Sequence, residues 1–285
     1  MNQPENMPLV SIITPVFNGA AYIEELILSI KTQDYPNIEH IIIDDGSQDN
    51  GATVEILQRY PHLRWWSREN RGQYTTMNEA LESATGQYIC FISADDFMMK
   101  CAVRCAMDWL KIHSEFDGVY GLTSYVSENG ESYPLRFPFR RAPLRYYPYF
   151  TQLQHCSLYI SRQTLLQKKL TFDPAIRFVG DYDWILRMLK AGIKIGFIDL
   201  PLSTIRIHKN QMSSRNRSLM TKEQIELANR NGFGGFRFNF YLNILHGLNF
   251  LEQLRFAFKK NQFVGVKDFL NTWIYDKLIL RFRDK

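Results

Sequence analysis

Residues 41–47 read Ile-Ile-Ile-Asp-Asp-Gly-Ser, an apolar run that ends in two adjacent acids and a turn. A second run of this kind, residues 88–96, reads Tyr-Ile-Cys-Phe-Ile-Ser-Ala-Asp-Asp. Short apolar runs that end at turn residues are typical of strands buried inside a sheet. Because open α/β sheets bind ligands beyond the carboxyl ends of their strands, both acidic pairs are expected at one ligand-binding edge.

The sequence around these two runs alternates between strand-like and helix-like segments. Apolar residues that recur every three or four positions mark the helices. Strands that alternate with helices of this length predict an α/β fold, with a mostly parallel sheet and helices on both of its faces. The predicted strands cover residues 10–14, 38–43, 63–67 and 88–92, and the helices between them cover 23–30, 53–60 and 74–84.

Beyond Asp96 the alternation loosens. We expect a helix near residues 99–112, a strand near 119–126 and a turn at Asn129-Gly130. Residues 134–150 are crowded with Arg, Pro, Phe and Tyr, which favours an irregular surface loop. Long loops of this kind are often functional.

The composition is that of an ordinary globular protein, with 45% hydrophobic and 22% charged residues over 285 positions. This length allows one large domain and an appendage. Residues 1–8 form a polar lead-in without the apolar core of an export signal, so a cytoplasmic protein is expected. The four cysteines fit a reducing compartment, and Cys101 and Cys105 are interpreted as buried thiols because no second Cys or His pair completes a zinc site.

The net charge of +5 comes from the end of the chain. Residues 232–285 contain nine Lys or Arg and four Asp or Glu, so the first 231 residues are neutral overall. Basic helices rich in aromatic residues, as this tail predicts, suit an anionic membrane surface, here the inner face of the cytoplasmic membrane. The alternative is that they pack on the main domain and expose a solvated basic face.

The tail is not expected to cross a membrane or to bind nucleic acid. Its longest uncharged run, residues 238–251, is interrupted by Asn and His, whereas a spanning helix needs about 20 apolar residues. No nucleic-acid-binding motif accompanies the basic charge.

The first motif that suits ligand binding lies at the end of the first predicted strand, where residues 14–19 read Thr-Pro-Val-Phe-Asn-Gly. A proline followed by an aromatic residue and Asn-Gly allows a sharp turn that presents the flat ring of Phe17 to the crevice. Burial of Phe17 in the core is the alternative. At the next strand, Asp45 is predicted to accept from a nucleobase N–H, and Asp44 to organise the backbone as an Asx turn or cap.

The motif Ser93-Ala94-Asp95-Asp96 suits a divalent cation. Mg²⁺ and Mn²⁺ take hard oxygen ligands and are often held by one or two carboxylates together with substrate phosphates. Two adjacent acids after an apolar strand are costly unless a cation offsets their charge. We therefore expect a cation at this pair, with a helix N-cap as the alternative for one of the two acids.

A further motif opens a predicted amphipathic helix within residues 179–189. Trp184, Ile185 and Met188 define its apolar face, which puts Asp181 and Asp183 at the start of the helix. Either acid can serve as an ordinary helix cap. An acid that faces the metal site would instead be a general base for an acceptor hydroxyl.

Together these motifs resemble the family 2 glycosyltransferases, which have the GT-A (Rossmann-like) fold. Each motif is common alone, but five of them in the family's order are highly specific. The resemblance runs from Val10 to about His208 and implies a catalytic domain over residues 1–217, with a basic, aromatic-rich helical extension over 218–285. The segments that carry it are residues 11–18, 43–47, 69–72, 94–96 and 180–183.

The resemblance implies an inverting transfer from a nucleotide-diphosphate sugar to an acceptor hydroxyl, with Mg²⁺ or Mn²⁺ as cofactor. Asp181 matches the family's catalytic base, and Asp96 matches the metal ligand, so Asp96 is expected to face the surface. His208 matches a position that contacts the metal or the diphosphate. Contacts to the nucleotide sugar are implied for Pro15, Phe17, Asn18, Asp45, Arg71 and Asp95.

Three positions qualify this resemblance. Ser93 and Gly180 stand where related sequences often have acids, which leaves metal affinity and base orientation open. His155 opens a strand-like segment, and we interpret it as a structural histidine rather than as an acceptor contact.

We hypothesise a glycosyltransferase of surface polysaccharide biosynthesis that acts on a saccharide or a lipid-linked saccharide. A catalytically silent sugar-nucleotide-binding or assembly subunit is the alternative, against which the intact Asp45, Asp96 and Asp181 argue. A nicotinamide dehydrogenase is disfavoured because no Gly-x-Gly-x-x-Gly follows the first strand. A nucleotidyltransferase is disfavoured because no glycine-rich, basic phosphate loop opens the sheet.

Overall fold

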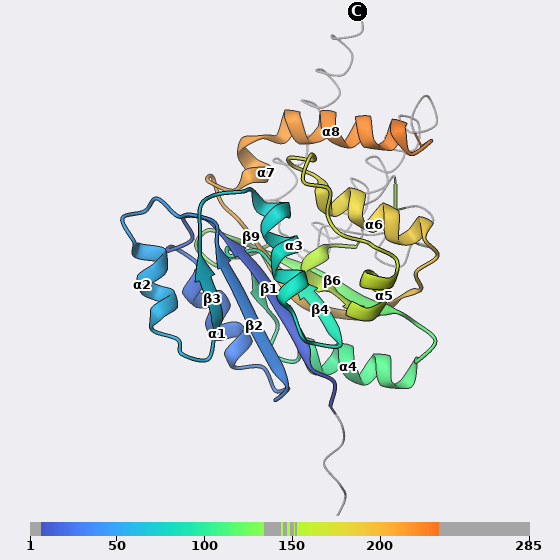
Figure 1. The fold of residues 1–285 in the computed structure, drawn as a ribbon, viewed down its shortest axis with the longest axis horizontal. Coiled ribbons are helices and arrows are strands. Elements are labelled where there is room, and N and C mark those ends of the chain that lie inside the picture. Colours follow the sequence, from blue (N-terminus) through green and yellow to red (C-terminus); the bar gives the residue numbers. More distant parts are fainter. Residues whose placement is uncertain (1–6, 134–143, 145–146, 149–150, 152, 234–285) are drawn as a thin grey trace, which may run out of the picture.

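A computed structural model describes residues 7–133, 144, 147–148, 151 and 153–233, which form an α/β sheet flanked by helices (Figure 1). The first half of the sheet is parallel, in the order β3-β2-β1-β4. The predicted alternation is confirmed there to within about two residues at each boundary. The elements are β1 (Val10–Val16), α1 (Ile23–Lys31), β2 (Ile38–Asp44), α2 (Ala52–Gln58), β3 (Arg64–Ser67), α3 (Gln73–Ser83) and β4 (Tyr88–Phe91).

The register of the parallel strands sets where the acidic pairs lie. Val16 at the end of β1 pairs with Asp44 at the end of β2, and Ile13 of β1 pairs with Phe91 of β4. Both acidic pairs therefore follow strands that flank β1 and end at the same edge of the sheet. The expectation that one edge carries both pairs is confirmed.

The second half of the sheet is mixed, in the order β4-β8-β6-β9-β5. The strand β8 runs antiparallel to both β4 and β6, while β6 and β9 form a long parallel pair. The predicted turn at Asn129-Gly130 joins β6 to β7, but the sequence pattern did not reveal β5 or β9. These strands are β5 (Phe97–Met98), β6 (Gly118–Ser127), β7 (Ser132–Tyr133), β8 (Leu158–Ser161) and β9 (Ile195–Ile207).

Hydrophobic side chains bury both faces of the sheet. On one face, Ile13, Ile41 and Ile43 pack against α3 and the helix α6 (Gly180–Lys190). On the other face, Ile12 and Ile42 pack against α1, α2 and the helix α4 (Ala102–Ile112). Neighbouring residues of one strand point to opposite faces, so these unbroken apolar runs are buried on both sides. Helices on both faces were predicted and are confirmed.

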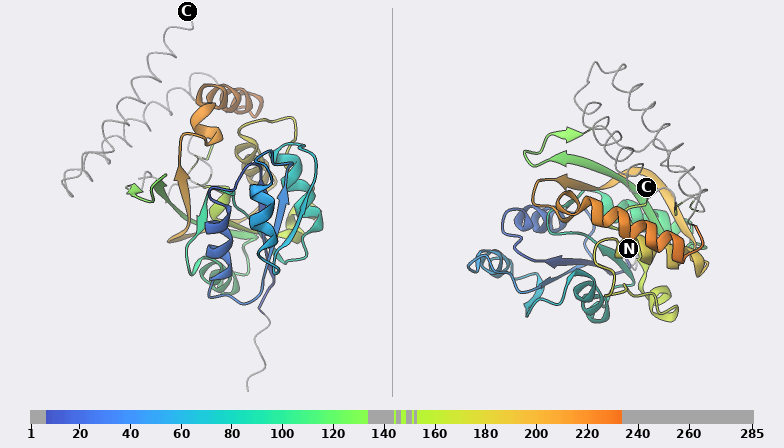
Figure 2. Two further views of the ribbon diagram at one scale, coloured as in Figure 1. Left: turned by 90° about the vertical axis from the view of Figure 1, so that its left-hand side faces the viewer. Right: turned by 90° about the horizontal axis from the view of Figure 1, so that it is seen from above.

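The described chain ends with two helices, α7 (Met212–Arg215) and α8 (Arg217–Arg230). In Figure 1, α8 lies above α6, and Figure 2 shows it at the same end of the molecule in the turned view. Within the described residues, no helix is long and apolar enough to cross a membrane. The basic tail proposed for membrane docking lies outside the described residues apart from Gly232 and Phe233, as does most of the segment 134–150.

The two cysteines that are four residues apart do not both match their predicted burial. Cys101 is exposed at the N-terminus of α4, and Cys105 is only partly buried. The interpretation of both as buried thiols is therefore wrong for Cys101, because the first residue before a helix faces solvent here. The fully buried thiols are Cys90 and Cys156.

Candidate active site

The loop after β1 presents an aromatic ring at the edge of the sheet. Phe17 is 46% exposed, so its assignment to the core is wrong and its predicted exposure is confirmed. Asn18 adopts a left-handed conformation, with φ of +52°, and its side-chain oxygen accepts from the Gln48 backbone N–H at 2.6 Å. The Asn18 N–H donates to the Ser47 hydroxyl at 2.8 Å. These two bonds tie the loop after β1 to the loop after β2, beside the half-buried Pro15.

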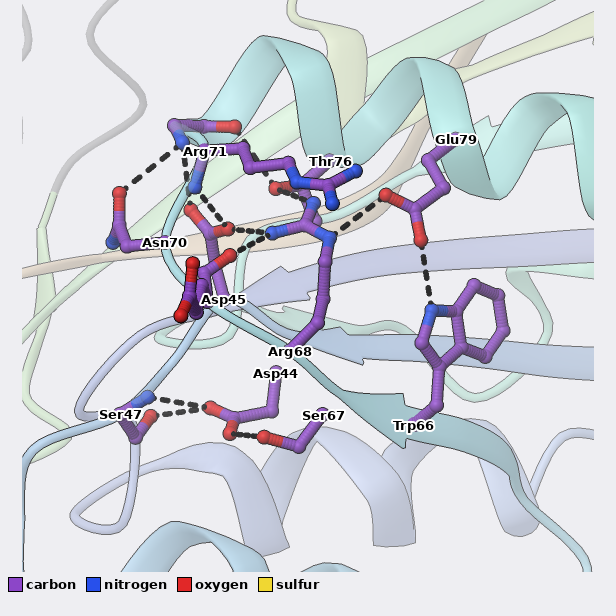
Figure 3. Close-up of polar contacts among 12 residues, drawn as sticks. Asp44, Asp45, Ser47, Trp66, Ser67, Arg68, Asn70, Arg71, Thr76 and Glu79 are labelled. Atoms are coloured by element: carbon purple, nitrogen blue, oxygen red, sulfur yellow. Dashed lines mark hydrogen bonds and ion pairs between the residues drawn. The ribbon is translucent and has the colours of Figure 1, made fainter.

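Asp44 and Asp45 are both buried but hold different parts of the site (Figure 3). Asp44 accepts from the backbone N–H of Ser47 at 3.2 Å and from the hydroxyls of Ser47 and Ser67, both at 2.5 Å. The prediction that Asp44 organises the backbone is confirmed, although the bonded N–H lies three residues on, as in a cap, rather than two as in an Asx turn. Asp45 accepts from the backbone N–H groups of Arg71 at 2.8 Å and of Gly72 at 3.0 Å, and also from an arginine side chain.

That arginine is Arg68, which sequence reasoning did not identify. Its Nη1 contacts Asp45, its Nε donates to Glu79 at 2.8 Å, and its Nη2 donates to Thr76 at 2.9 Å. Glu79 also accepts from the Trp66 indole N–H at 2.9 Å (Figure 3). Four of the five guanidinium N–H groups are used, since Nη1 also donates to the Glu69 carbonyl. Arg68 therefore holds Asp45 in place.

The loop around Asp45 leaves little freedom to its backbone. Gly46 has φ of +75°, and a Cβ there would lie 2.9 Å from the Asn70 nitrogen, so only glycine fits where the two loops meet. The side chain of Arg71 is exposed. On Asp45, Oδ1 accepts two hydrogen bonds and Oδ2 accepts one, which leaves acceptor capacity on Oδ2 for a further donor.

The second acidic pair meets the end of β9. His208 Nε2 lies 3.0 Å from Asp95 Oδ2, and Asp96 Oδ1 accepts from the Arg206 backbone N–H at 3.1 Å. The expectation that Asp96 faces the surface is wrong, since it is 4% exposed. The reason is β9, which was not predicted and which covers Asp96 with its backbone. Burial, and then the neighbouring Asp95 carboxylate, raise the pKa of Asp96 well above its ordinary value.

A buried cation accompanies this pair without neutralising it. The Arg206 guanidinium is 5% exposed, pairs with Glu25 at 2.5 Å and lies over the ring of Tyr22 at 5.1 Å. His208 is also close to Tyr22, and within the described residues its buried Nδ1 has no hydrogen-bond partner.

The donor set here is suited to Mg²⁺ or Mn²⁺. Two adjacent carboxylates, one of them buried with a raised pKa, supply the hard oxygens that these ions prefer. Among the described residues, however, no three His, Cys, Asp or Glu side chains are already arranged as a metal cage. The residues fit an ion that takes one or two protein carboxylates and its remaining ligands from water or phosphate.

The candidate base Asp181 lies at the start of α6 beside a histidine. Its Oδ2 is 3.2 Å from His155 Nδ1, and because a carboxylate only accepts, the proton belongs to the histidine nitrogen. Burial by itself would raise the pKa of Asp181, but the interaction with His155, together with backbone N–H groups at the start of α6, outweighs it and lowers the pKa. The Asp181 side chain is 31% exposed. Asp183, the other candidate, is buried and bonded to Arg187 at 2.6 Å.

His155 belongs to a turn that also packs against β4 and β9. It opens a short 3-10 turn, η2 (His155–Ser157), which includes the buried Cys156. Burial, and then the charge of Asp96, raise the pKa of the Cys156 thiol to about 12. The turn η2 thus contacts Asp181 through His155, and it contacts β4 and β9, the strands next to Asp96, through Cys156. His155 contacts Asp181 directly, a role that its interpretation as a structural histidine did not include.

The structure accounts for the glycine that precedes Asp181. A Cβ on Gly180 would lie 2.6 Å from the ring of Tyr74, and the Gly180 N–H donates to the Tyr74 hydroxyl at 2.8 Å. No acidic side chain fits at this position while Tyr74 stays in place. The departure from the family pattern at Gly180 is thus compensated by a hydroxyl that binds the start of the helix.

Solved glycosyltransferases share this fold. S. aureus TarS in complex with UDP-GlcNAc aligns with a TM-score of 0.63 at 19% identity, over 84% of this chain and 71% of that chain. Mannosyltransferase PcManGT from Pyrobaculum calidifontis in complex with GDP-Man and Mn²⁺ aligns with a TM-score of 0.62 at 19% identity, over 99% of this chain and 83% of that chain. At such identities the likeness shows the fold alone, which is the GT-A fold of glycosyltransferases.

Sequence comparisons give the family. An uncharacterized glycosyltransferase of Rickettsia felis is 31% identical over 218 residues, which are 73% of this chain and 36% of that protein, so this chain spans about a third of its length. The putative teichuronic acid biosynthesis glycosyltransferase TuaG of Bacillus subtilis is 30% identical over 215 residues, 73% of this chain and 82% of TuaG. The model of glycosyl transferase family 2 matches residues 11–171. The chain therefore belongs to glycosyl transferase family 2, which confirms the resemblance in its motifs.

Proposed function

We propose that this protein is a metal-dependent, inverting glycosyltransferase that moves a sugar from a nucleotide-diphosphate donor to an acceptor hydroxyl in polysaccharide biosynthesis. The similarity to TuaG supports the biosynthetic role. The UDP-GlcNAc and GDP-Man complexes of proteins with the same fold support a nucleotide sugar as donor. The observation that carries the proposal is an ionised, partly exposed Asp181 whose partner His155 opens η2, the turn that also contacts β4 and β9 next to Asp96.

Donor binding is assigned to the loops after β1 and β2. Phe17 offers an exposed ring on which a nucleobase can stack, and Pro15 and Asn18 shape the loop that carries it. Asp45 accepts a base N–H through the capacity left on Oδ2. The exposed guanidinium of Arg71 suits the diphosphate, because arginine pairs well with phosphate oxygens.

The metal is assigned to Asp96 with His208, and Asp95 to the adjoining part of the donor. A bound Mg²⁺ or Mn²⁺ supplies charge that stabilises the departing diphosphate. In the protein itself, Asp96 provides the buried carboxylate, and the Arg206 N–H holds its other side. His208 is oriented by Asp95 through Nε2.

Asp181 is assigned as the general base. Its lowered pKa keeps the carboxylate ionised near neutral pH, so that it can accept the proton of an acceptor hydroxyl. The bond from His155 leaves one carboxylate oxygen to face that hydroxyl. Attack on the face opposite the leaving diphosphate inverts the anomeric carbon in one displacement, without a covalent enzyme intermediate.

The domain division and the cellular position also remain proposals. We assign residues 1–217 to the catalytic domain and 218–285 to a basic extension that holds a cytoplasmic enzyme near anionic lipid and a lipid-linked acceptor. Co-sedimentation with vesicles that contain anionic lipid tests this position. Binding at low salt that is lost at high salt is expected, because salt screens the attraction of Lys and Arg to the surface. Indifference to vesicles at every salt concentration would favour the packed-subdomain alternative.

Release of nucleoside diphosphate tests the reaction. UDP-GlcNAc, GDP-Man and further nucleotide sugars are incubated with the protein, with Mn²⁺ or with EDTA. Metal-dependent release that the variant Asp181→Asn does not support is expected of the enzyme, and the anomeric configuration of the product by NMR tests inversion. Donor binding without release, by the wild type and the variant alike, would favour the silent subunit.

A further inference from the structure

Helix α8 contacts the start of the helix that carries Asp181. One carboxylate of α8, that of Glu223, accepts from the backbone N–H groups of Arg177 at 2.8 Å, Phe178 at 2.7 Å and Val179 at 3.0 Å. These three residues immediately precede α6. The helix α8 lies beyond the residues that the family model matches, so this contact is not part of the shared motifs.

The contact supplies an acceptor to backbone N–H groups near the start of α6. The N–H groups at the start of a helix lack partners within the helix, and they carry partial positive charge that favours a carboxylate. Glu223 takes the N–H of the N-cap residue Val179 and the two N–H groups before it, and the Tyr74 hydroxyl takes the next one, from Gly180. Four consecutive N–H groups are thus held by two side chains from elsewhere in the fold.

The held segment ends at the catalytic position. Asp181 is the next residue after Gly180, so its backbone follows directly from the four bonded groups. A hydrogen bond to a charged acceptor is roughly twice as strong as one between neutral groups, and here one carboxylate makes three. Leu227 and Ala228 are the buried residues of α8, and the three bonds of Glu223 add a polar attachment of this helix to the segment before α6.

We propose that Glu223 is a positioning residue, through which α8 holds the start of α6 and aims the Asp181 carboxylate at the acceptor hydroxyl. The role rests on the proposed function of Asp181 as general base. Glu223 acts through Asp181 and does not contact substrate. A catalytic group that is displaced by about 1 Å can lower the rate by about 10². If Asp181 is held less firmly, kcat is therefore expected to fall between about tenfold and 10²-fold.

The test compares two charge-removing variants on one helix. Glu223→Gln replaces a carboxylate oxygen by an NH₂ group that cannot accept from a backbone N–H. Glu226→Gln removes the same charge from an exposed position three residues along α8 and serves as the control. Hydrogen exchange at the amides of residues 177–179, kcat for release of nucleoside diphosphate, and donor affinity are measured for both. Glu223→Gln is expected to lose exchange protection and kcat while donor affinity stays unchanged, and Glu226→Gln to match the wild type.

A double mutant separates positioning from general destabilisation. If Glu223 acts through Asp181, Glu223→Gln should lower kcat no further once Asp181→Asn is present. Full additivity of the two losses, a parallel loss of donor affinity, or unchanged exchange at residues 177–179 would each overturn the proposal. These results leave the proposed function standing, whereas a wild-type protein that transfers no sugar from any donor would overturn both.

Discussion

Two of the candidate carboxylates of the site, Asp45 and Asp181, are held in opposite ways. Asp45 is 5% exposed in its side chain and is surrounded by a guanidinium and two backbone N–H groups. Asp181 is 31% exposed and has one side-chain partner, His155. A group that recognises a nucleobase gains from being fixed in advance, because binding then costs less ordering. A general base must keep an oxygen available to the substrate, so its support comes through the backbone of α6.

The largest expected effect comes from removing the base. Asp181→Asn keeps the size of the side chain but loses its ability to accept a proton, and kcat should fall by about 10² or more. Donor affinity should stay within about twofold of wild type, because the proposed role of Asp181 is toward the acceptor rather than the donor. Single-turnover rates and nucleotide titrations measure the two quantities. Near-normal turnover would contradict the assignment of Asp181 as general base and favour its alternative interpretation as a helix cap.

Substituting Arg68, the cation that holds Asp45, should instead lower both the stability of the protein and its affinity for the donor. Arg68→Met leaves the buried Asp45 carboxylate without its cation, and the free energy of unfolding should fall by about 3 kcal/mol. The matched control is Arg64→Met on the same strand, whose ion pair with Glu39 is half exposed and should contribute about 1 kcal/mol or less. Chemical denaturation gives both values. Equal effects of the two variants would mean that Arg68 is no more than a surface charge.

Removing the metal, or substituting its proposed buried ligand Asp96, should lower the free energy of unfolding by a similar or smaller amount than Arg68→Met does. This loss should appear only when nucleotide is present. A ligand at 100 times its Kd stabilises a protein by about 2.7 kcal/mol. The wild type should gain such stabilisation from UDP with Mn²⁺ and lose it with EDTA, whereas Asp96→Asn should gain little in either condition. The amide oxygen of the substituted side chain would still accept from the Arg206 N–H, so the variant should fold. A variant that responds to Mn²⁺ as the wild type does would contradict the assignment of Asp96.

The smallest expected effect concerns pH and the parallel half of the sheet. Burial alone would raise the pKa of Glu39, but hydrogen bonds from Ser11, Thr85 and Gly86 outweigh it and lower the pKa. A carboxyl whose pKa is lowered by folding contributes stability above its unfolded pKa, about 4.3, and loses it as the pH falls through the lower folded value. Wild type should therefore exceed Glu39→Gln in stability at pH 7 and approach it below about pH 4. A constant difference in the unfolding free energy across this range would disprove the linkage.

The parallel half of the fold could be predicted because its signals are local. Apolar strand runs, helical periodicity and acids at strand ends all lie within a few residues of one another. The mixed half was harder to predict, because β5 has two residues and β9 is defined by its partners β6 and β5 rather than by its own pattern. Because β9 was not predicted, the burial of Asp96 beneath its backbone was not predicted either.

The family, the chain order of the parallel strands and helices, and the acidic pairs at the sheet edge could all be predicted from the amino-acid sequence. The partner of each acid became known only from the folded chain. Arg68 reaches Asp45 across 23 residues, His155 reaches Asp181 across 26, and Glu223 reaches the segment before α6 across 44 to 46. The physical reason is that periodicity and strand ends are properties of neighbouring residues. The hydrogen bonds and burial that set the charge and position of a carboxylate depend on residues that meet only after the chain has folded.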